Sequence, residues 1–93
     1  MLKEPLNPVE ARRLIQHILS QGEVTFSTHA LDELAKDRLD IVDCRNTLRG
    51  GRVEPAELEH GSWRYRVFAP RMAVVVAFRS EQKLIVVTAW RMR

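Results

Sequence analysis

The longest apolar run of this chain extends over residues 72–78, and it constrains the fold more than any other segment. Its length suits one β-strand and falls well short of the roughly 20 apolar residues that a membrane-spanning helix needs. Because the run is apolar at every position, both of its faces must be buried, and we expect the central strand of a sheet. We expect no membrane association for such a chain.

Helical periodicity precedes this strand. Apolar residues recur at helical spacing behind Asn7, a residue suited to the N-cap, and Gly22 is expected to end that first helix in the left-handed conformation. Two further capped segments of the same kind follow a short extended piece. We therefore expect helices over residues 8–21, 28–37 and 41–49, with the extended piece over residues 24–27.

Strand-like segments make up the rest of the chain, over residues 52–58, 62–68, 72–79 and 83–91. Pro55 places the first of them at a sheet edge or shortens it, because proline cannot donate to a strand ladder. Three helices followed by a meander of strands predict an α+β domain, with the N-terminal helices packed on a twisted antiparallel sheet of three to five strands. The length of the chain predicts a single domain over residues 1–93.

Charge is divided unevenly between the two parts of the chain. Residues 1–60 hold eight Lys and Arg against eleven Asp and Glu, whereas residues 61–93 hold seven against one. Arginine presents a planar fork of donors that fits phosphate and stacks on rings. The last third therefore predicts recognition of an anionic partner, either RNA or an acidic protein. The alternative is that exposed strands carry arginine for solubility and against edge pairing.

Cysteine and histidine usage narrows the class of protein. The single cysteine, Cys44, excludes an internal disulfide and lies on an apolar helical stripe, where we expect a core residue. The polar N-terminal residues lack the apolar run of a signal peptide, so we expect a cytoplasmic protein. His17, His29 and His60 show no metal-ligand spacing, and no cofactor motif is present, so we expect neither metal nor cofactor.

Strand alternation suggests where the arginines point. In the strand over residues 62–68, Arg64 and Arg66 should share one side, opposite Trp63, Tyr65 and Val67. The strand over residues 83–91 should present one side made of Leu84, Val86, Thr88 and Trp90 and another made of Ile85, Val87, Ala89 and Arg91. If the pairing register allows, Arg64, Arg66 and Arg91 converge on one basic patch.

His29 falls in the first turn of the second expected helix, directly after the extended piece. An imidazole at that position could act as a general base or contact a phosphate. The alternative is that His29 orders the strand-to-helix turn through a hydrogen bond.

Three short motifs occur in a familiar order: F-S-T-H-A at residues 26–30, W-R-Y-R-V at 63–67 and I-V-V-T-A-W-R at 85–91. This order resembles a family of small bacterial domains of unknown function that open with an F-S-x-H-A motif and look related to the MqsR and RelE toxins. The resemblance implies a RelE-like fold, metal-independent endonucleolytic cleavage of mRNA, and an antitoxin partner that covers the basic face. Its matching positions are His29, Arg64, Tyr65, Thr88 and Arg91. The family usually carries Arg and Met on the helix after the histidine, where this chain has Glu33 and Leu34, and a later basic position of the family falls near Asp37-Arg38.

RNA cleavage without a metal uses the 2′-hydroxyl as nucleophile and needs groups that move protons and cations that stabilise the phosphorane. Arginines would hold the phosphate, with Arg79 as an outer candidate, His29 or Tyr65 would handle protons, and a tryptophan would stack a base. We thus expect catalysis from His29, Tyr65, Arg64 and Arg91 and RNA binding from Arg66, Arg79, Trp63, Trp90 and Thr88.

Two other functions remain open at this point. A non-catalytic module could bind RNA or an acidic protein through the same basic face. The chain could also be a structural protein that dimerises by pairing an exposed strand with the same strand of a second copy.

Overall fold

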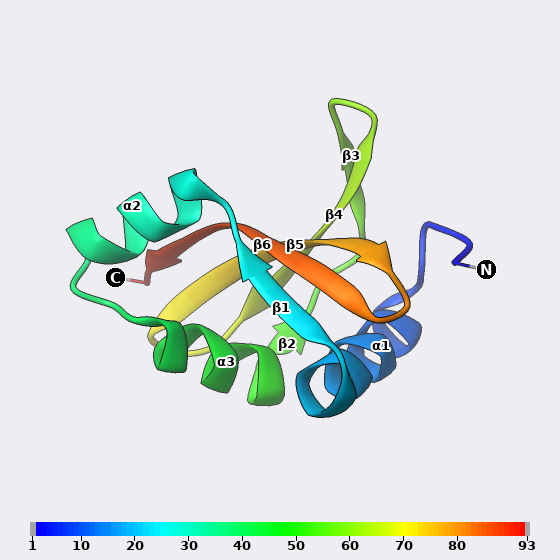
Figure 1. Cartoon of the computed structure of the whole chain (residues 1–93), viewed down its shortest axis with the longest axis horizontal. Helices are drawn as coiled ribbons and strands as arrows, with labels where there is room; N and C mark the ends of the chain where they lie inside the picture. Colours follow the sequence, from blue (N-terminus) through cyan, green and yellow to red (C-terminus); the bar gives the residue numbers. More distant parts are fainter. Residues whose placement is uncertain (1, 93) are drawn as a thin grey trace.

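A computed structural model describes residues 2–92 of the chain (Figure 1). Its elements, in order, are α1 (Pro8–Gln21), β1 (Glu23–Phe26), α2 (Thr28–Lys36), α3 (Ile41–Gly50), β2 (Arg52–Val53), β3 (Glu57–Glu59), β4 (Ser62–Phe68), β5 (Met72–Ser80) and β6 (Lys83–Arg91). The three helices and the last three strands lie close to the ranges that the sequence predicts, and the α+β class is confirmed. Within the described range, none of the helices combines the length and the apolarity that a bilayer crossing requires.

Local capping explains where the helices begin. Asn7 and Glu10 bond each other's backbone N–H groups in a capping box at the start of α1, and Asp40 and Asp43 do the same for α3. The predicted left-handed end of α1 is wrong, because Gly22 adopts an extended conformation with φ −115°. A glycine is nevertheless needed there, since a Cβ would collide with the carbonyl group of Gln82.

The sheet has six strands and is mixed, which corrects the expected antiparallel sheet of three to five strands. Strand order is β1-β6-β5-β4-β2, with β3 paired to β4 off this path, and β1 runs parallel to its neighbour β6. The extended piece after α1 thus forms an edge strand of the sheet, and its partner β6 follows about sixty residues later in the chain. As predicted, β5 is central, and its first seven residues are all buried.

Pro55 divides the first expected strand into two. β2 stays at the sheet edge opposite the end of β4, whereas β3 pairs with the beginning of β4. The β3–β4 hairpin projects from the body of the molecule as an arm (Figure 1). Its turn contains His60 and Gly61, which both have positive φ.

A β-bulge in β6 changes the expected alternation of that strand. Val75 pairs with Thr88 while Val76 pairs with Val86, so Val87 is an extra residue without a partner in β5. Beyond the bulge the side chains of β6 exchange faces of the sheet, so Ala89, rather than Thr88, joins Val86 in the core. The prediction that Thr88 and Trp90 share a side with Leu84 and Val86 is therefore wrong.

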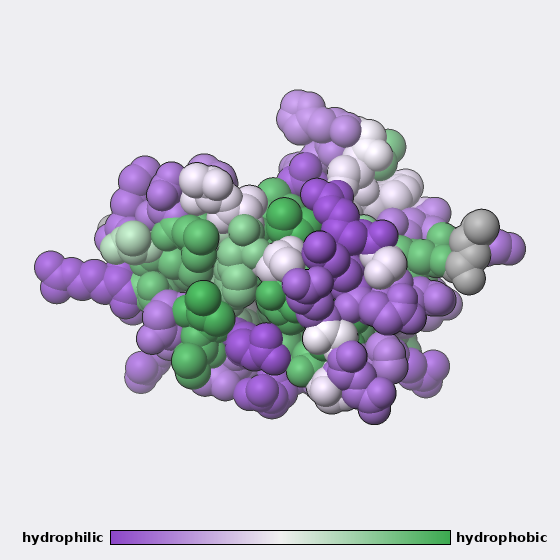
Figure 2. All heavy atoms as spheres, viewed as in Figure 1, coloured by the Kyte–Doolittle hydropathy of each residue, from purple (hydrophilic) through white to green (hydrophobic). Residues whose placement is uncertain are grey.

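The surface between α2 and α3 is apolar, as the green area of Figure 2 shows. Leu31 is 45% exposed, Ile41 46% and Val42 62%. These three residues line a pocket of about 330 Å³, which we call the apolar pocket. Exposed apolar residues that gather in one place are a common feature of contact surfaces for proteins.

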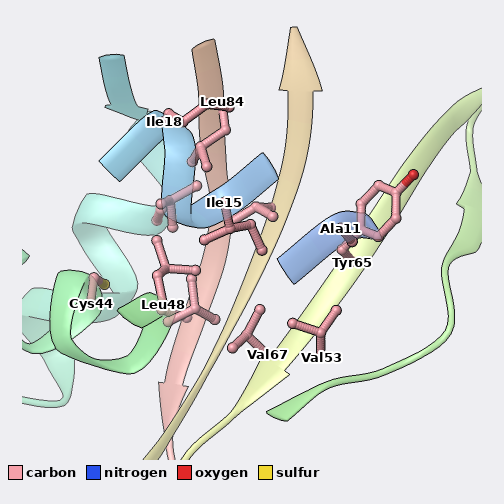
Figure 3. Close-up of a cluster of buried hydrophobic side chains, with 14 of the residues drawn as sticks. Ala11, Ile15, Ile18, Cys44, Leu48, Val53, Tyr65, Val67 and Leu84 are labelled. Atoms are coloured by element: carbon pink, nitrogen blue, oxygen red, sulfur yellow. The ribbon is translucent and has the colours of Figure 1, made fainter. Parts of the chain in front are cut away.

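The core lies between the three helices and one face of the sheet, which we call the helix face (Figure 3). Ile15 and Ile18 of α1 meet Leu48 of α3 over Val67 and Leu84 of the sheet, and all five side chains are at most 1% exposed. Burial of such side chains contributes about 1.5–3 kcal/mol each and sets the position of the helices on the sheet. The opposite side of the sheet is called the outer face below.

Candidate functional site

Arg64 and Arg66 lie on the outer face, as the alternation of β4 predicts, but acidic residues of the arm neutralise them. Arg66 donates to Glu57 and, at 3.3 Å, to Glu59, while Arg64 lies 3.9 Å from Glu59. The arginine side chains are only 20% and 25% exposed. Two of the cations expected to hold phosphate are therefore already paired with carboxylates.

Tyr65 faces the other way and is fully buried. Its hydroxyl donates to the Glu4 carboxylate at 2.8 Å and accepts from the Leu6 N–H at 3.0 Å. Burial, followed by the nearby Glu4, raises the pKa of Tyr65 to about 12, although the Leu6 N–H opposes that change. This geometry ties the N-terminal segment to the sheet, and it gives Tyr65 a structural role with no path to a surface ligand.

His29 is exposed in the first turn of α2, and its side chain makes no hydrogen bond or ion pair with any other part of residues 2–92. The strand-to-helix turn is instead ordered by Ser27, whose hydroxyl donates to the Val87 carbonyl and accepts from the Ala30 N–H. Along α2, a rise of about 1.5 Å per residue places His29 about 12 Å from the end of the helix at Asp37. His29 and Arg91 are therefore not neighbours, because Arg91 contacts Asp37.

Arg91 lies on the helix face, opposite Arg64 and Arg66. It pairs across the strands with the buried Met72, and its backbone N–H donates to the Asp37 carboxylate at 2.9 Å. Its guanidinium donates to the Asp37 carbonyl oxygen at 2.6 Å, which leaves most of its donors without a partner in the described chain. The bulge at Val87 thus prevents the three arginines from forming the single patch that the sequence suggested.

Arg91 instead joins two other arginines in a groove of about 480 Å³ between the end of α2, α3 and the β4–β5 turn. Neither Arg38 nor Arg71 forms an ion pair or hydrogen bond through its guanidinium within the described residues. Asp43 is the one acidic residue of the lining, and its Oδ2 is engaged by the Asp40 N–H. We call this the arginine groove; it is lined by Arg38, Leu39, Asp43, Asn46, Thr47, Ala69, Pro70, Arg71, Met72 and Arg91.

Arg38 occupies an unusual conformation for its residue type. Its φ is +56°, in the left-handed region that favours glycine, and the backbone closes α2 by bonds from Arg38 N–H to Ala35 and from Leu39 N–H to Leu34. A side chain in this conformation costs roughly 1–2 kcal/mol relative to glycine. This left-handed residue ends the helix and places the Arg38 side chain at the rim of the groove.

The backbone holds Arg71 at the opposite rim. The β4–β5 turn is closed by a bond from the Ala69 N–H to Met72 at 2.9 Å, and the Met92 N–H reaches the Arg71 carbonyl at 2.8 Å. The turn is therefore tied to the end of β6, so Arg71 and Arg91 keep a fixed relation. Sequence reasoning did not select Arg38 or Arg71 as site residues, since only the fold brings these segment ends together.

The remaining predicted site residues are distributed over the molecule. Trp63 packs against the core from β4, and Arg79 is exposed near the opposite end of β5 from the groove. Thr88 and Trp90 lie on the outer face, where the Trp90 ring meets Phe68 edge-on at a centroid distance of 6.3 Å. Of the nine predicted site residues, only Arg91 lines the arginine groove.

The position of Cys44 determines the chemistry of its thiol. Cys44 is buried in the core, and burial, followed by Asp43 and Asp40, raises the pKa of its thiol to about 11. A thiol with a raised pKa is a poor nucleophile and metal ligand. Across residues 2–92, no three His, Cys, Asp or Glu side chains are grouped as metal ligands.

Comparison with known proteins identifies one family. The model of a family described as "Domain of unknown function (DUF4258)" matches residues 26–91, which include every strand but β1, both shorter helices and all three groove arginines. No curated protein and no solved structure matches this chain.

Proposed function

We propose that this chain, which belongs to the DUF4258 family, binds RNA by holding a backbone phosphate in the arginine groove. One observation carries the proposal: three guanidinium groups line a single concavity, and none of them forms an ion pair with a carboxylate within the described residues. Arginine binds phosphate oxygens through paired N–H donors and keeps its charge at any physiological pH. An overall formal charge of +3 adds long-range attraction to the same ligand.

Binding of labelled RNA at several salt concentrations tests this proposal. Arg38→Ala and Arg71→Ala should each weaken binding and reduce the steepness of the salt dependence by roughly one counterion, because each removes one phosphate contact. Arg13→Ala is the matched control, since Arg13 is an exposed arginine on α1 without a contact to the groove. Equal affinities of all three variants would rule out the groove as the RNA site.

Toxin-like, metal-independent cleavage of mRNA is the second candidate function. It is favoured by Asp43, whose carboxylate shares the groove with the three guanidiniums. A carboxylate there could accept the proton of a 2′-hydroxyl as its oxygen attacks phosphorus and the bond to the 5′-oxygen breaks, while arginines stabilise the added negative charge. The leaving 5′-oxygen would take its proton from water.

Incubation of labelled RNA with the protein in excess EDTA distinguishes cleavage from binding. An active enzyme should give fragments with cyclic phosphate ends, and Asp43→Asn should stop cleavage while RNA is still bound. Because Asp43 also caps α3, thermal unfolding of the variant must accompany the assay. Intact RNA with the wild-type protein would leave binding as the function.

An antitoxin partner belongs to this second candidate, and the apolar pocket offers it a contact surface. Leu39 lines both the apolar pocket and the arginine groove, so one partner segment could cover both. Charge complementarity then calls for a segment with apolar side chains followed by acidic ones. Val42→Asp should abolish binding of such a segment without affecting RNA binding, because Val42 is 62% exposed and lines only the apolar pocket.

A further inference from the structure

The geometry points to single-stranded RNA as the ligand, held on both faces of one end of the sheet: a phosphate in the arginine groove and an unpaired base on the outer face. The proposed base site is a row formed by Arg52, Phe68 and Trp90, which we call the stacking row. This inference rests on the proposed function, since it takes the groove as the phosphate site. It adds a second site and restricts the substrate to strands with free bases.

The strand register builds the stacking row. Phe68 pairs with Arg52 on one side and with Ala73 on the other, and Ala73 pairs with Trp90, so all four side chains lie on one line across the outer face. The Arg52 guanidinium lies 5.7 Å from the centroid of the Phe68 ring, and the Phe68 and Trp90 rings meet at 78°. Ala73 has too small a side chain to fill its place and is 0% exposed, because the rings on either side cover it.

Access to the row is open from the solvent side. Phe68 and Trp90 are both half-buried, and the Arg52 side chain is 72% exposed. The Arg52 Nε donates to Glu54 at 3.0 Å, and an ion pair this exposed is worth about 0–1 kcal/mol. Aromatic rings and an arginine in one line offer a base a surface for stacking and for cation–π contact. A base in a duplex has no free face to offer, so this row selects single strands.

The groove and the row are adjacent because strand neighbours point to opposite faces. Trp90 and Arg91 are consecutive in β6, as are Phe68 and Ala69 at the end of β4, and in each pair one residue belongs to the row and the next to the groove. Only the thickness of one sheet separates the two sites. An RNA strand that passes over the β4–β5 turn at Arg71 therefore meets both.

Tryptophan fluorescence tests the inference directly. In a Trp63→Phe background, Trp90 is the only tryptophan of the chain. Titration with oligoadenosine should quench its emission, whereas the duplex of oligoadenosine with oligouridine should leave the emission unchanged and bind more weakly. In the same background, Trp90→Leu and Phe68→Leu should each lower the affinity for oligoadenosine roughly tenfold, in line with the loss of one stacking contact, and leave the salt dependence intact.

The possible negative results distinguish a failure of the stacking row from a failure of the phosphate site. If duplex and single strand bind equally and quench equally, or if neither Trp90→Leu nor Phe68→Leu changes the affinity, the stacking row is not a base site. The phosphate site would still stand in that case, provided that Arg71→Ala weakens binding. Thermal melting would show whether Trp90→Leu loses binding because it unfolds. In that case Phe68→Leu, which keeps an apolar cover over Ala73, decides whether the stacking row binds a base. If Arg71→Ala also binds normally, both proposals fail.

Discussion

Among single residues, Arg38 bears most directly on the proposed phosphate site. Its backbone conformation suits glycine, whereas its side chain reaches a groove that already holds two other arginines. Stability and binding therefore make opposite demands on this position. A site that accepts a less stable residue is a good place to look for function.

We predict that Arg38→Gly raises the free energy of unfolding by about 1 kcal/mol. Glycine relieves a strain of roughly 1–2 kcal/mol, and the greater freedom of glycine in the unfolded chain offsets about 0.4–1 kcal/mol of that gain. The same change should weaken RNA binding by removing a phosphate contact. Denaturant titration and RNA titration measure the two effects. Arg38→Ala is the matched control: it should lose binding without the gain in stability. A glycine variant that is less stable than the wild type would contradict this account.

Tyr65 shows how a residue of an apparent functional motif can serve the fold. Its hydroxyl joins Glu4 and Leu6 to β4, so Tyr65→Phe should cost about 1–2 kcal/mol by leaving those two groups unpaired. The pKa of Tyr65 is raised from 10.0 to about 12 in the folded state, so its contribution is complete below pH 10 and is lost as the pH rises through 12. Unfolding of wild type and variant over this pH range should show a stability difference that shrinks. A difference independent of pH would contradict the assigned hydrogen bonds.

At the scale of elements, the arm decides what the outer face can do. Glu57 and Glu59 of β3 hold Arg64 and Arg66 of β4, so the arm supplies its own counter-charges. Arg66 lies on the outer face of β4, two residues before Phe68 of the stacking row. The glutamates of β3 thus limit the positive charge next to the proposed base site.

Neutralising the arm should therefore strengthen RNA binding. We predict that the double change Glu57→Gln and Glu59→Gln raises the affinity for oligoadenosine and steepens its salt dependence by roughly one to two counterions, because Arg64 and Arg66 become free to meet phosphate. Arg64→Ala in the wild-type protein should change affinity little. Anisotropy titrations at several salt concentrations give both quantities. An unchanged affinity in the double variant would show that RNA does not reach the outer face beside the arm.

The whole molecule explains which features the sequence could reveal. Caps such as the Asn7–Glu10 box and the apolar run of β5 act through near neighbours, and the elements they define were predicted correctly. The pairing of β1 with β6 and the bulge at Val87 depend on contacts between distant segments, and neither has a local signal. The bulge alone decides that Arg91 joins Arg38 and Arg71 rather than the arginines of β4.

This convergence of three chain segments makes the groove a property of the folded state only, and folding stability must then respond to a ligand of the groove. A ligand that binds only the folded chain stabilises it by on the order of 1.4 kcal/mol at ten times its dissociation constant. We predict that inorganic phosphate raises the melting temperature more than chloride at equal ionic strength, since chloride screens charge but cannot accept paired N–H donors. Thermal unfolding of the wild type, the Arg38→Ala/Arg71→Ala double variant and the Arg13→Ala control measures this difference. The control should keep the phosphate effect and the double variant should lose it; a phosphate effect retained by the double variant would mean that the anion binds elsewhere.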